Sequence, residues 1–93
     1  MTYSLIFTES YAQRERRFLK RHADILNQYH KTLKLLELDP YHPSLRLHAL
    51  KGKLEGLHSV SINISYRITL EFIIQERELL LVNIGTYDKL YRY

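Results

Sequence analysis

Apolar and polar positions in the first half of the chain predict one strand followed by two helices. Residues 3–7 are rich in β-formers, and Thr8 or Ser10 can cap a helix that begins near Ser10. Asp24 can cap a second helix that ends at about Leu38. Apolar residues recur at helical spacing in both segments, so the two helices are expected to form a hairpin with one buried side.

The second half of the chain alternates with a period of two, which predicts strands. Three strands are expected at residues 57–64, 66–75 and 78–85, with a tight turn at Ser65 between the first two. Residues 39–47 contain both prolines and are expected to form an ordered loop that crosses the sheet. The last strand is apolar on both faces over most of its length, so we expect it to lie centrally and covered.

The alternation within the first two of these strands divides their side chains between a buried face and an open face. Expected beneath the helices are Val60, Ile62, Ile64, Ile68, Leu70 and Phe72. Expected together on the open face are Ser59, Ser61, Asn63, Arg67 and Thr69. A small polar surface that carries one arginine is therefore the expected place for binding.

The order strand, helix, helix, strand, strand, strand defines the fold class as α+β. We expect the N-terminal strand and the helical hairpin to pack on one face of a small, mainly antiparallel sheet. The chain has 93 residues, which suffice for one hydrophobic core and one domain that spans residues 1–93.

The charge of the chain narrows the class of partner. Its formal net charge is +4, which favours an anionic partner. Basic residues gather in two places, with Arg14, Arg16, Arg17, Lys20 and Arg21 in the first helix and Arg46, Lys51 and Lys53 in the loop before the strands. The helical group is equally typical of a solvated helix surface.

The composition excludes several other classes of site. The chain contains no cysteine, which excludes a disulfide framework and a thiolate metal site and fits a reducing cytoplasm. The histidines His42, His48 and His58 are not spaced as a compact ligand set, so we expect no metal and no cofactor. The N-terminal apolar run is too short for a signal peptide or a membrane span, so we expect a cytoplasmic protein with no membrane partner.

Three sequence segments carry a resemblance to a known family. They are LHALKG before the first of the three strands, ISYRI at the junction of the first two strands, and IGTYDKLY at the C-terminus. Together with the order of elements, they make the whole chain similar to the RelE/ParE superfamily of type II toxin–antitoxin toxins in bacteria and archaea, especially its YafQ, RelE and HigB branches.

The resemblance implies a function and a set of partners. It implies a ribosome-dependent, metal-independent endoribonuclease that cleaves mRNA. The partners would be a cognate antitoxin, mRNA and the ribosome, with toxin and antitoxin joined in a heterotetramer or a larger complex. A metal-free ribonuclease needs a base, a cation for the phosphorane charge and an acid for the leaving oxygen, because RNA carries its own nucleophile.

The same resemblance implies the catalytic residues. Arg67 matches an arginine that contacts the scissile phosphate, with an ion pair to Glu71 or simple solubility as the alternative. His48 matches the histidine of an H-x-L-x-G pattern that serves in acid–base catalysis, or it merely caps its loop. Tyr91 matches a terminal aromatic residue, and Tyr87 stands where relatives carry a histidine; both are alternatively core or antitoxin contacts.

A second group of residues is expected to bind RNA. It comprises Lys51, Lys53, Arg46 and His58, with solvated or structural roles as the alternative. Active relatives carry charged residues where this chain has Ser59, Ser61, Asn63 and Ser65. That departure leaves open a catalytically weakened relative, or a non-catalytic ParE-like inhibitor of DNA gyrase.

Overall fold

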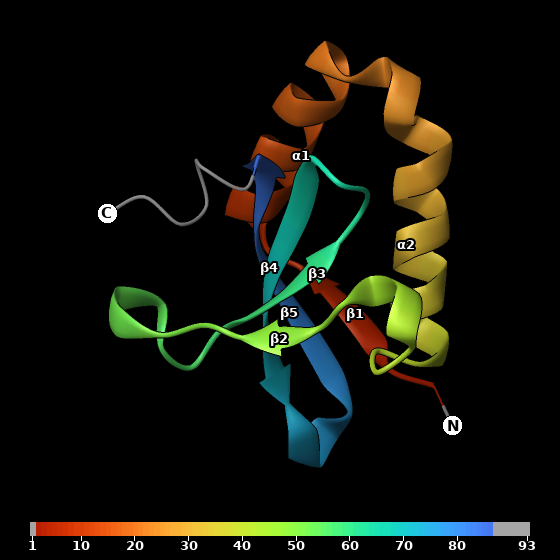
Figure 1. The fold of residues 1–93 in the computed structure, drawn as a ribbon. Helices are drawn as coiled ribbons and strands as arrows, with labels where there is room; N and C mark the ends of the chain where they lie inside the picture. Colours follow the sequence, from red (N-terminus) through yellow and green to blue (C-terminus); the bar gives the residue numbers. More distant parts are fainter. Residues whose placement is uncertain (1, 87–93) are drawn as a thin grey trace.

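The computed structural model describes residues 2–86, which form a five-stranded mixed sheet and a helical hairpin. In chain order the elements are β1 (Ser4–Phe7), α1 (Glu9–Arg21), α2 (Leu26–Leu38), β2 (His48–Ala49), β3 (His58–Ser61), β4 (Tyr66–Ile73) and β5 (Glu78–Thr86). The strand order is β1-β5-β4-β3-β2, with β1 parallel to β5 and the other neighbours antiparallel. The expected α+β class and mainly antiparallel sheet are confirmed (Figure 1).

The N-terminal cap of the first helix is as expected, but the connection between the two helices is not. Thr8 is the N-cap of α1, since its Oγ1 accepts a hydrogen bond of 3.2 Å from the Tyr11 amide. The expectation that Asp24 caps α2 is wrong. The chain reverses through a 3-10 turn, Ala23–Ile25, which buries Ile25 directly before α2 and leaves that helix without a side-chain cap.

The two helices are joined by a buried polar chain. The hydroxyls of Tyr11 on α1 and Tyr29 on α2 lie 2.8 Å apart, and neither side chain is exposed. Tyr29 also donates a hydrogen bond of 2.5 Å to Glu15 Oε2. Because each hydroxyl is satisfied inside the protein, the two rings can fill the core without the cost of an unpaired buried polar group.

A bulge in β5 sets which of its side chains reach the helices. Leu70 of β4 opposes Leu81 and Thr69 opposes Asn83, so the intervening Val82 has no opposite residue. The shift lets residues on both sides of the bulge contribute to the core, which includes Leu79, Leu81 and Ile84. β5 lies between β1 and β4, so its expected central position is confirmed from Glu78 to Leu81, where it pairs with both strands.

The expected division of side chains between the two faces is partly wrong. Ser59 and Thr69 are buried, with 0% and 2% of their surface exposed, although the sequence placed them on an open face. Ile64, expected beneath the helices, is fully exposed, because β3 ends at Ser61. Asn63 is not a strand residue either, since its Oδ1 accepts hydrogen bonds from two backbone amides of the following turn.

The segment between α2 and β3 contains a strand that the sequence did not predict. The two residues of β2 pair with β3, His48 opposite Ser59 and Ala49 opposite His58. In Figure 1 α1 lies behind the sheet and α2 lies beside it, while β2 and β3 cross in front.

No helix in the described part of the chain is long and apolar enough to cross a lipid bilayer.

Candidate functional site

Arg67 is held on the sheet face opposite the helices by hydrogen bonds at both ends of its guanidinium. It lies near the start of β4, where its Nε donates a hydrogen bond of 2.7 Å to Ser59 Oγ on β3. Its Nη2 donates to the Arg46 carbonyl at 3.2 Å and lies 3.3 Å from His48 Nδ1. These contacts fix the side chain across the β3–β4 hairpin, and they do not include the alternative ion pair with Glu71.

Ser59 is the central element of this arrangement. In the sheet, Ser59 lies opposite Thr69 on β4 and opposite His48 on β2. β2 borders Ser59 on one side and the Arg67 side chain reaches it from the other, which is why a residue expected to be open is buried. The buried hydroxyl accepts from a charged group, a contact stronger than one between two neutral groups.

The backbone of Arg46 positions the other half of the site. Arg46 ends a 3-10 turn, Pro43–Leu45, in the left-handed conformation with φ of 50°. This conformation is uncommon for a residue with a side chain and reverses the chain just before β2. As a result the Arg46 carbonyl faces both Arg67 Nη2 and His48 Nδ1, at 3.2 and 3.3 Å.

The contacts of His48 define its possible proton positions. Its Nδ1 faces one donor, Arg67 Nη2, and one acceptor, the Arg46 carbonyl. When Nδ1 carries a proton and donates to the carbonyl, Nε2 is left as the basic nitrogen of an exposed imidazole. In that tautomer Arg67 Nη2 donates to the Arg46 carbonyl alone. When Nδ1 instead carries no proton, it can accept a hydrogen bond from Arg67 Nη2, so these two contacts are compatible with either tautomer of His48.

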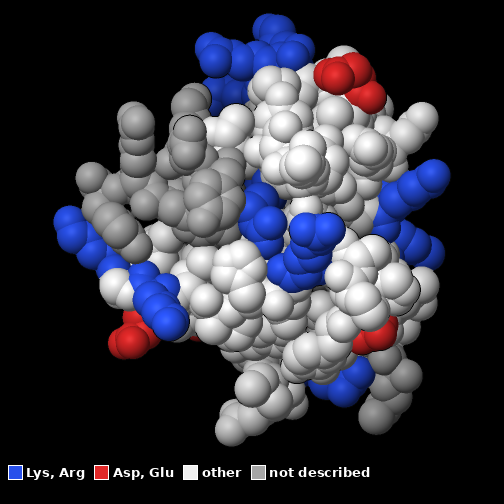
Figure 2. All heavy atoms as spheres, viewed as in Figure 1, with Lys and Arg blue, Asp and Glu red and all other residues white. Residues whose placement is uncertain are grey.

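The surrounding face is basic. Figure 2 shows Lys and Arg side chains in the middle of the face viewed in Figure 1, while the Asp and Glu side chains visible there lie toward its rim. Arg46, Lys51 and Lys53 are all exposed, the two lysines on the connection between β2 and β3. An exposed cationic face of this kind suits a polyanion.

The structure brings together some of the residues expected in the site and separates others. Arg67, His48 and Arg46 are in contact. His58 lies on the helix side of the sheet, opposite Leu70, with its ring against Phe72 at 4.9 Å between centroids. Its Nδ1 is buried and has no hydrogen-bond partner among residues 2–86. Tyr87 and Tyr91 lie outside the described residues.

Two parts of the site were not recognised in the sequence. The positioning role of Ser59 follows from the register of the β3–β4 hairpin. Ser61 lies directly opposite Arg67, and Ser59 lies two residues away from Ser61 on the same face of β3, where the long Arg67 side chain can reach it. The carbonyl of Arg46 carries no residue-specific signal. Among the residues that the structure describes, no three His, Asp or Glu side chains are grouped so as to hold a metal ion.

Comparison with solved structures finds this fold in bacterial proteins, one of them in a toxin–antitoxin complex. YafQ from Escherichia coli strain BL21(DE3) has a TM-score of 0.79 and 16% sequence identity, over 97% of this chain and 99% of YafQ. A chain of the E. coli DinJ–YafQ toxin–antitoxin complex has a TM-score of 0.77 and 17% identity, over 99% of this chain and 100% of that one. HP0894 from Helicobacter pylori has a TM-score of 0.74 and 23% identity, over 96% of this chain and 99% of HP0894.

These likenesses cover nearly the whole chain but lie at low sequence identity. No protein-family model matches the sequence, and a search of curated proteins gives no significant match. The structural likenesses show that the chain has the fold of the RelE/ParE toxin superfamily, which is the fold that its sequence resemblance implied.

Proposed function

We propose that this protein is the toxin of a type II toxin–antitoxin module and that it cleaves mRNA on the ribosome without a metal ion. One observation carries the proposal. A guanidinium fixed by Ser59 and by the Arg46 carbonyl stands beside the exposed imidazole of His48, whose Nδ1 faces the same carbonyl. A positioned cation and a positioned base are two of the three groups that metal-free RNA cleavage needs.

In the proposed reaction the RNA supplies its own nucleophile. His48 Nε2 takes the proton of the 2′-hydroxyl, whose oxygen then forms a bond to the neighbouring phosphorus. The bond from phosphorus to the 5′-oxygen of the next nucleotide breaks, and that oxygen takes up a proton. The products are a 2′,3′-cyclic phosphate and a 5′-hydroxyl. Arg67 stabilises the extra negative charge on the phosphorus oxygens.

Arg67 is prepared for this role by its hydrogen bonds. Nε and Nη2 are engaged by Ser59, Arg46 and His48, whereas Nη1 makes no hydrogen bond to any described residue. The side chain is thus held in one orientation with a donor left for substrate. Preorganised donors stabilise charge in a transition state without reorganising at the moment of reaction.

The remaining groups complete the proposal. Tyr91, or Tyr87, donates the proton to the leaving 5′-oxygen or stacks a base of the mRNA. The exposed side chains of Arg46, Lys51 and Lys53 hold the RNA backbone. His58, which lies on the helix side of the sheet, supports the fold and does not join them.

The proposed partners follow from the fold and the charge. DinJ–YafQ and RelBE2, which share this fold, are toxin–antitoxin complexes. We extend this to an antitoxin for the present chain, bound in a heterotetramer or larger complex, and to mRNA and the ribosome as its targets in the cytoplasm.

The proposal is tested by primer extension on mRNA incubated with translating ribosomes and the purified protein, with a ribosome-free reaction as control. Cuts that need ribosomes and are lost in Arg67→Ala support it. No cuts under either condition, together with inhibition of gyrase-catalysed supercoiling, would instead support the ParE-like alternative that the uncharged Ser59 and Ser61 leave open.

A further inference from the structure

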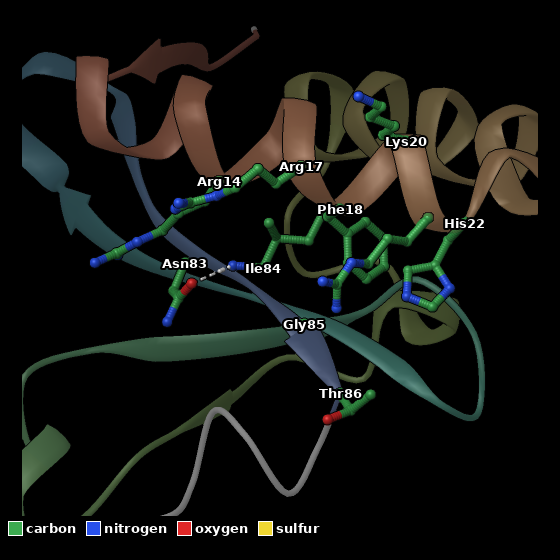
Figure 3. A pocket seen from close by; sticks show the side chains of 10 residues that line it. Arg14, Arg17, Phe18, Lys20, His22, Asn83, Ile84, Gly85 and Thr86 are labelled. Carbon is green, nitrogen blue, oxygen red and sulfur yellow. Dashed lines mark hydrogen bonds between the residues drawn. The ribbon is translucent and has the colours of Figure 1, made fainter.

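Asn83 on β5 lies on the same face of the sheet as Arg67. Arg67 and Thr69 alternate on β4 with core residues such as Ile68, so both project from the face opposite the helices. Asn83 lies directly opposite Thr69, so its side chain shares this face. Figure 3 shows the Asn83 carboxamide on the side of β5 away from α1. Asn83 therefore belongs to the face that carries the candidate site.

The backbone holds one end of the Asn83 carboxamide. Its Oδ1 accepts a hydrogen bond of 2.9 Å from the Ile84 amide. Because a backbone amide only donates, this bond fixes which end of the carboxamide is oxygen and which is nitrogen. In Figure 3 the nitrogen points away from α1. Nδ2 makes no hydrogen bond to any of residues 2–86, and the side chain is partly exposed, so Asn83 presents an oriented donor.

Neighbouring side chains do not duplicate this donor. Leu80 and Gly85 share this face of β5 with Asn83, and neither has a polar side chain. Thr69, directly opposite, is buried, with 2% of its surface exposed. At this part of the face, a ligand that needs a hydrogen bond from β5 can obtain it from the Asn83 side chain.

The Arg67 guanidinium and Asn83 lie on opposite sides of β4. Arg67 Nε donates to Ser59 on β3 and Nη2 lies beside His48 on β2, so the guanidinium is directed away from β5. Neighbouring strands lie about 4.8 Å apart, so about 10 Å separates β3 from β5. One phosphate group is too small to contact both side chains. A phosphate bound by Arg67 therefore leaves Asn83 to a different part of the nucleotide chain.

We infer that Asn83 is a specificity-determining residue, which donates from Nδ2 to a nucleobase carbonyl, O6 of guanine or O4 of uracil, next to the phosphate bound by Arg67. The inference deepens the proposed function and rests on it, since it assigns a part of the mRNA to this face. At the position of these carbonyls adenine and cytosine carry an amino group, which only donates.

The contact with Ile84 decides between the two kinds of base. Asparagine typically reads adenine with both ends of its carboxamide, because the oxygen accepts from the amino group while the nitrogen donates to the ring. In Asn83 the oxygen already accepts from the Ile84 amide. Donation from Nδ2 remains, and it matches the carbonyl of guanine or uracil.

The base contact is tested without ribosomes, by NMR on the full, isotopically labelled chain with four 2′-O-methyl trinucleotides. Each has cytidine on both sides of a central guanine, uracil, adenine or cytosine, and the 2′-O-methyl groups prevent cleavage. The guanine and uracil trinucleotides should shift the Asn83 side-chain amide signal about three times as far as the other two, or further. No shift by any of them at low millimolar concentration, or equal shifts by all, would overturn the inference.

Asn83→Asp tests the contact during cleavage, because it keeps the acceptor for the Ile84 amide and removes the donor. On ribosomes with mRNAs that differ only in a base flanking the cut, the wild type should cleave beside guanine or uracil about fivefold faster than beside adenine or cytosine, or more. Asn83→Asp should abolish or reverse this preference. Asn27→Asp, the same change at an exposed residue of α2, should retain it.

An unchanged base preference in Asn83→Asp, or equal slowing on all the mRNAs, would contradict the inference. The two measurements also separate the inference from the proposed function. Base-dependent shifts of the Asn83 signal without cleavage on ribosomes would contradict the nuclease function but not the base contact. Cleavage with a preference that Asn83→Asp leaves unchanged would contradict the base contact alone.

Discussion

Arg67 Nε donates a hydrogen bond of 2.7 Å to the buried Oγ of Ser59, eight residues earlier on the neighbouring strand. This bond crosses the β3–β4 hairpin diagonally and sets the direction of the guanidinium. Ser59 carries no charge itself. It orients the charge that Arg67 supplies, so an uncharged β3 is compatible with a functional site.

Ser59→Ala tests this positioning role. Loss of a hydrogen bond to a charged group costs about 1.5–3 kcal/mol, so the cleavage rate constant should fall about tenfold or more while KM changes little. Single-turnover cleavage on ribosomes measures both quantities. Ser65→Ala is the matched control, because its exposed side chain makes no hydrogen bond within the described residues. A loss confined to KM would show that Ser59 does not orient Arg67 for the reaction.

His48→Ala should reduce cleavage by about 10²–10⁴-fold, the usual contribution of a general base. The side chain lies at the surface, so its removal leaves a space open to solvent. Added imidazole should therefore restore part of the cleavage rate in this variant, and it should not do so in Arg67→Ala. Absence of any rescue, with wild-type folding by circular dichroism, would argue against a base at this position.

Arg46 allows its side chain and its backbone to be tested separately. Arg46→Gly removes the side chain but accepts the φ of 50° without strain, so the carbonyl keeps its place beside Arg67 and His48. KM should rise severalfold through the lost RNA contact while kcat stays within about twofold. Arg46→Val disfavours this backbone conformation, so kcat should fall at least fivefold. Equal kcat values in the two variants would show that the carbonyl does not matter.

The Tyr11–Tyr29 pair predicts how stability depends on alkaline pH. Burial raises the pKa of the Tyr29 hydroxyl, and Tyr11 and Glu15 raise it further; burial likewise raises the pKa of Tyr11. An unfolded tyrosine titrates near pH 10. The contribution of these two tyrosines to the free energy of unfolding should hence be constant below about pH 10 and fall above it, by up to about 1.4 kcal/mol per pH unit for each tyrosine.

Urea unfolding between about pH 8 and 11 measures this dependence. Tyr29→Phe should lower the free energy of unfolding near neutral pH by about 1–3 kcal/mol, because Tyr11 and Glu15 lose their shared partner. The same variant should lose stability less steeply above about pH 10. A wild-type protein whose stability does not change up to pH 11 would contradict the assignment.

The sequence predicted the order of the elements because hydrophobic periodicity is local and the main elements are long enough to show it. It did not predict β2, which has only two residues. It also assigned the face of Ile64 and Asn63 wrongly, because the end of β3 depends on side-chain hydrogen bonds that Asn63 makes to the turn. Hydrophobic periodicity carries no information about such contacts.

The side chains of the candidate site were predicted only for its arginines and its histidine. Arg67, His48 and Arg46 were identified as residue types suited to RNA chemistry, and the structure brings these three together. The roles of Ser59 and of the Arg46 carbonyl depend on strand register and on a left-handed backbone conformation. Neither is encoded in a local pattern, so both required the structure.

The most direct test of the central claim is the single-turnover rate of mRNA cleavage on programmed ribosomes by Arg67→Ala, compared with Arg16→Ala on the exposed surface of α1. Removal of a preorganised cation should slow cleavage by about 10²–10³-fold, whereas the control should remain within about threefold of wild type. Equal rates for the two variants would contradict the proposal that Arg67 stabilises the transition state.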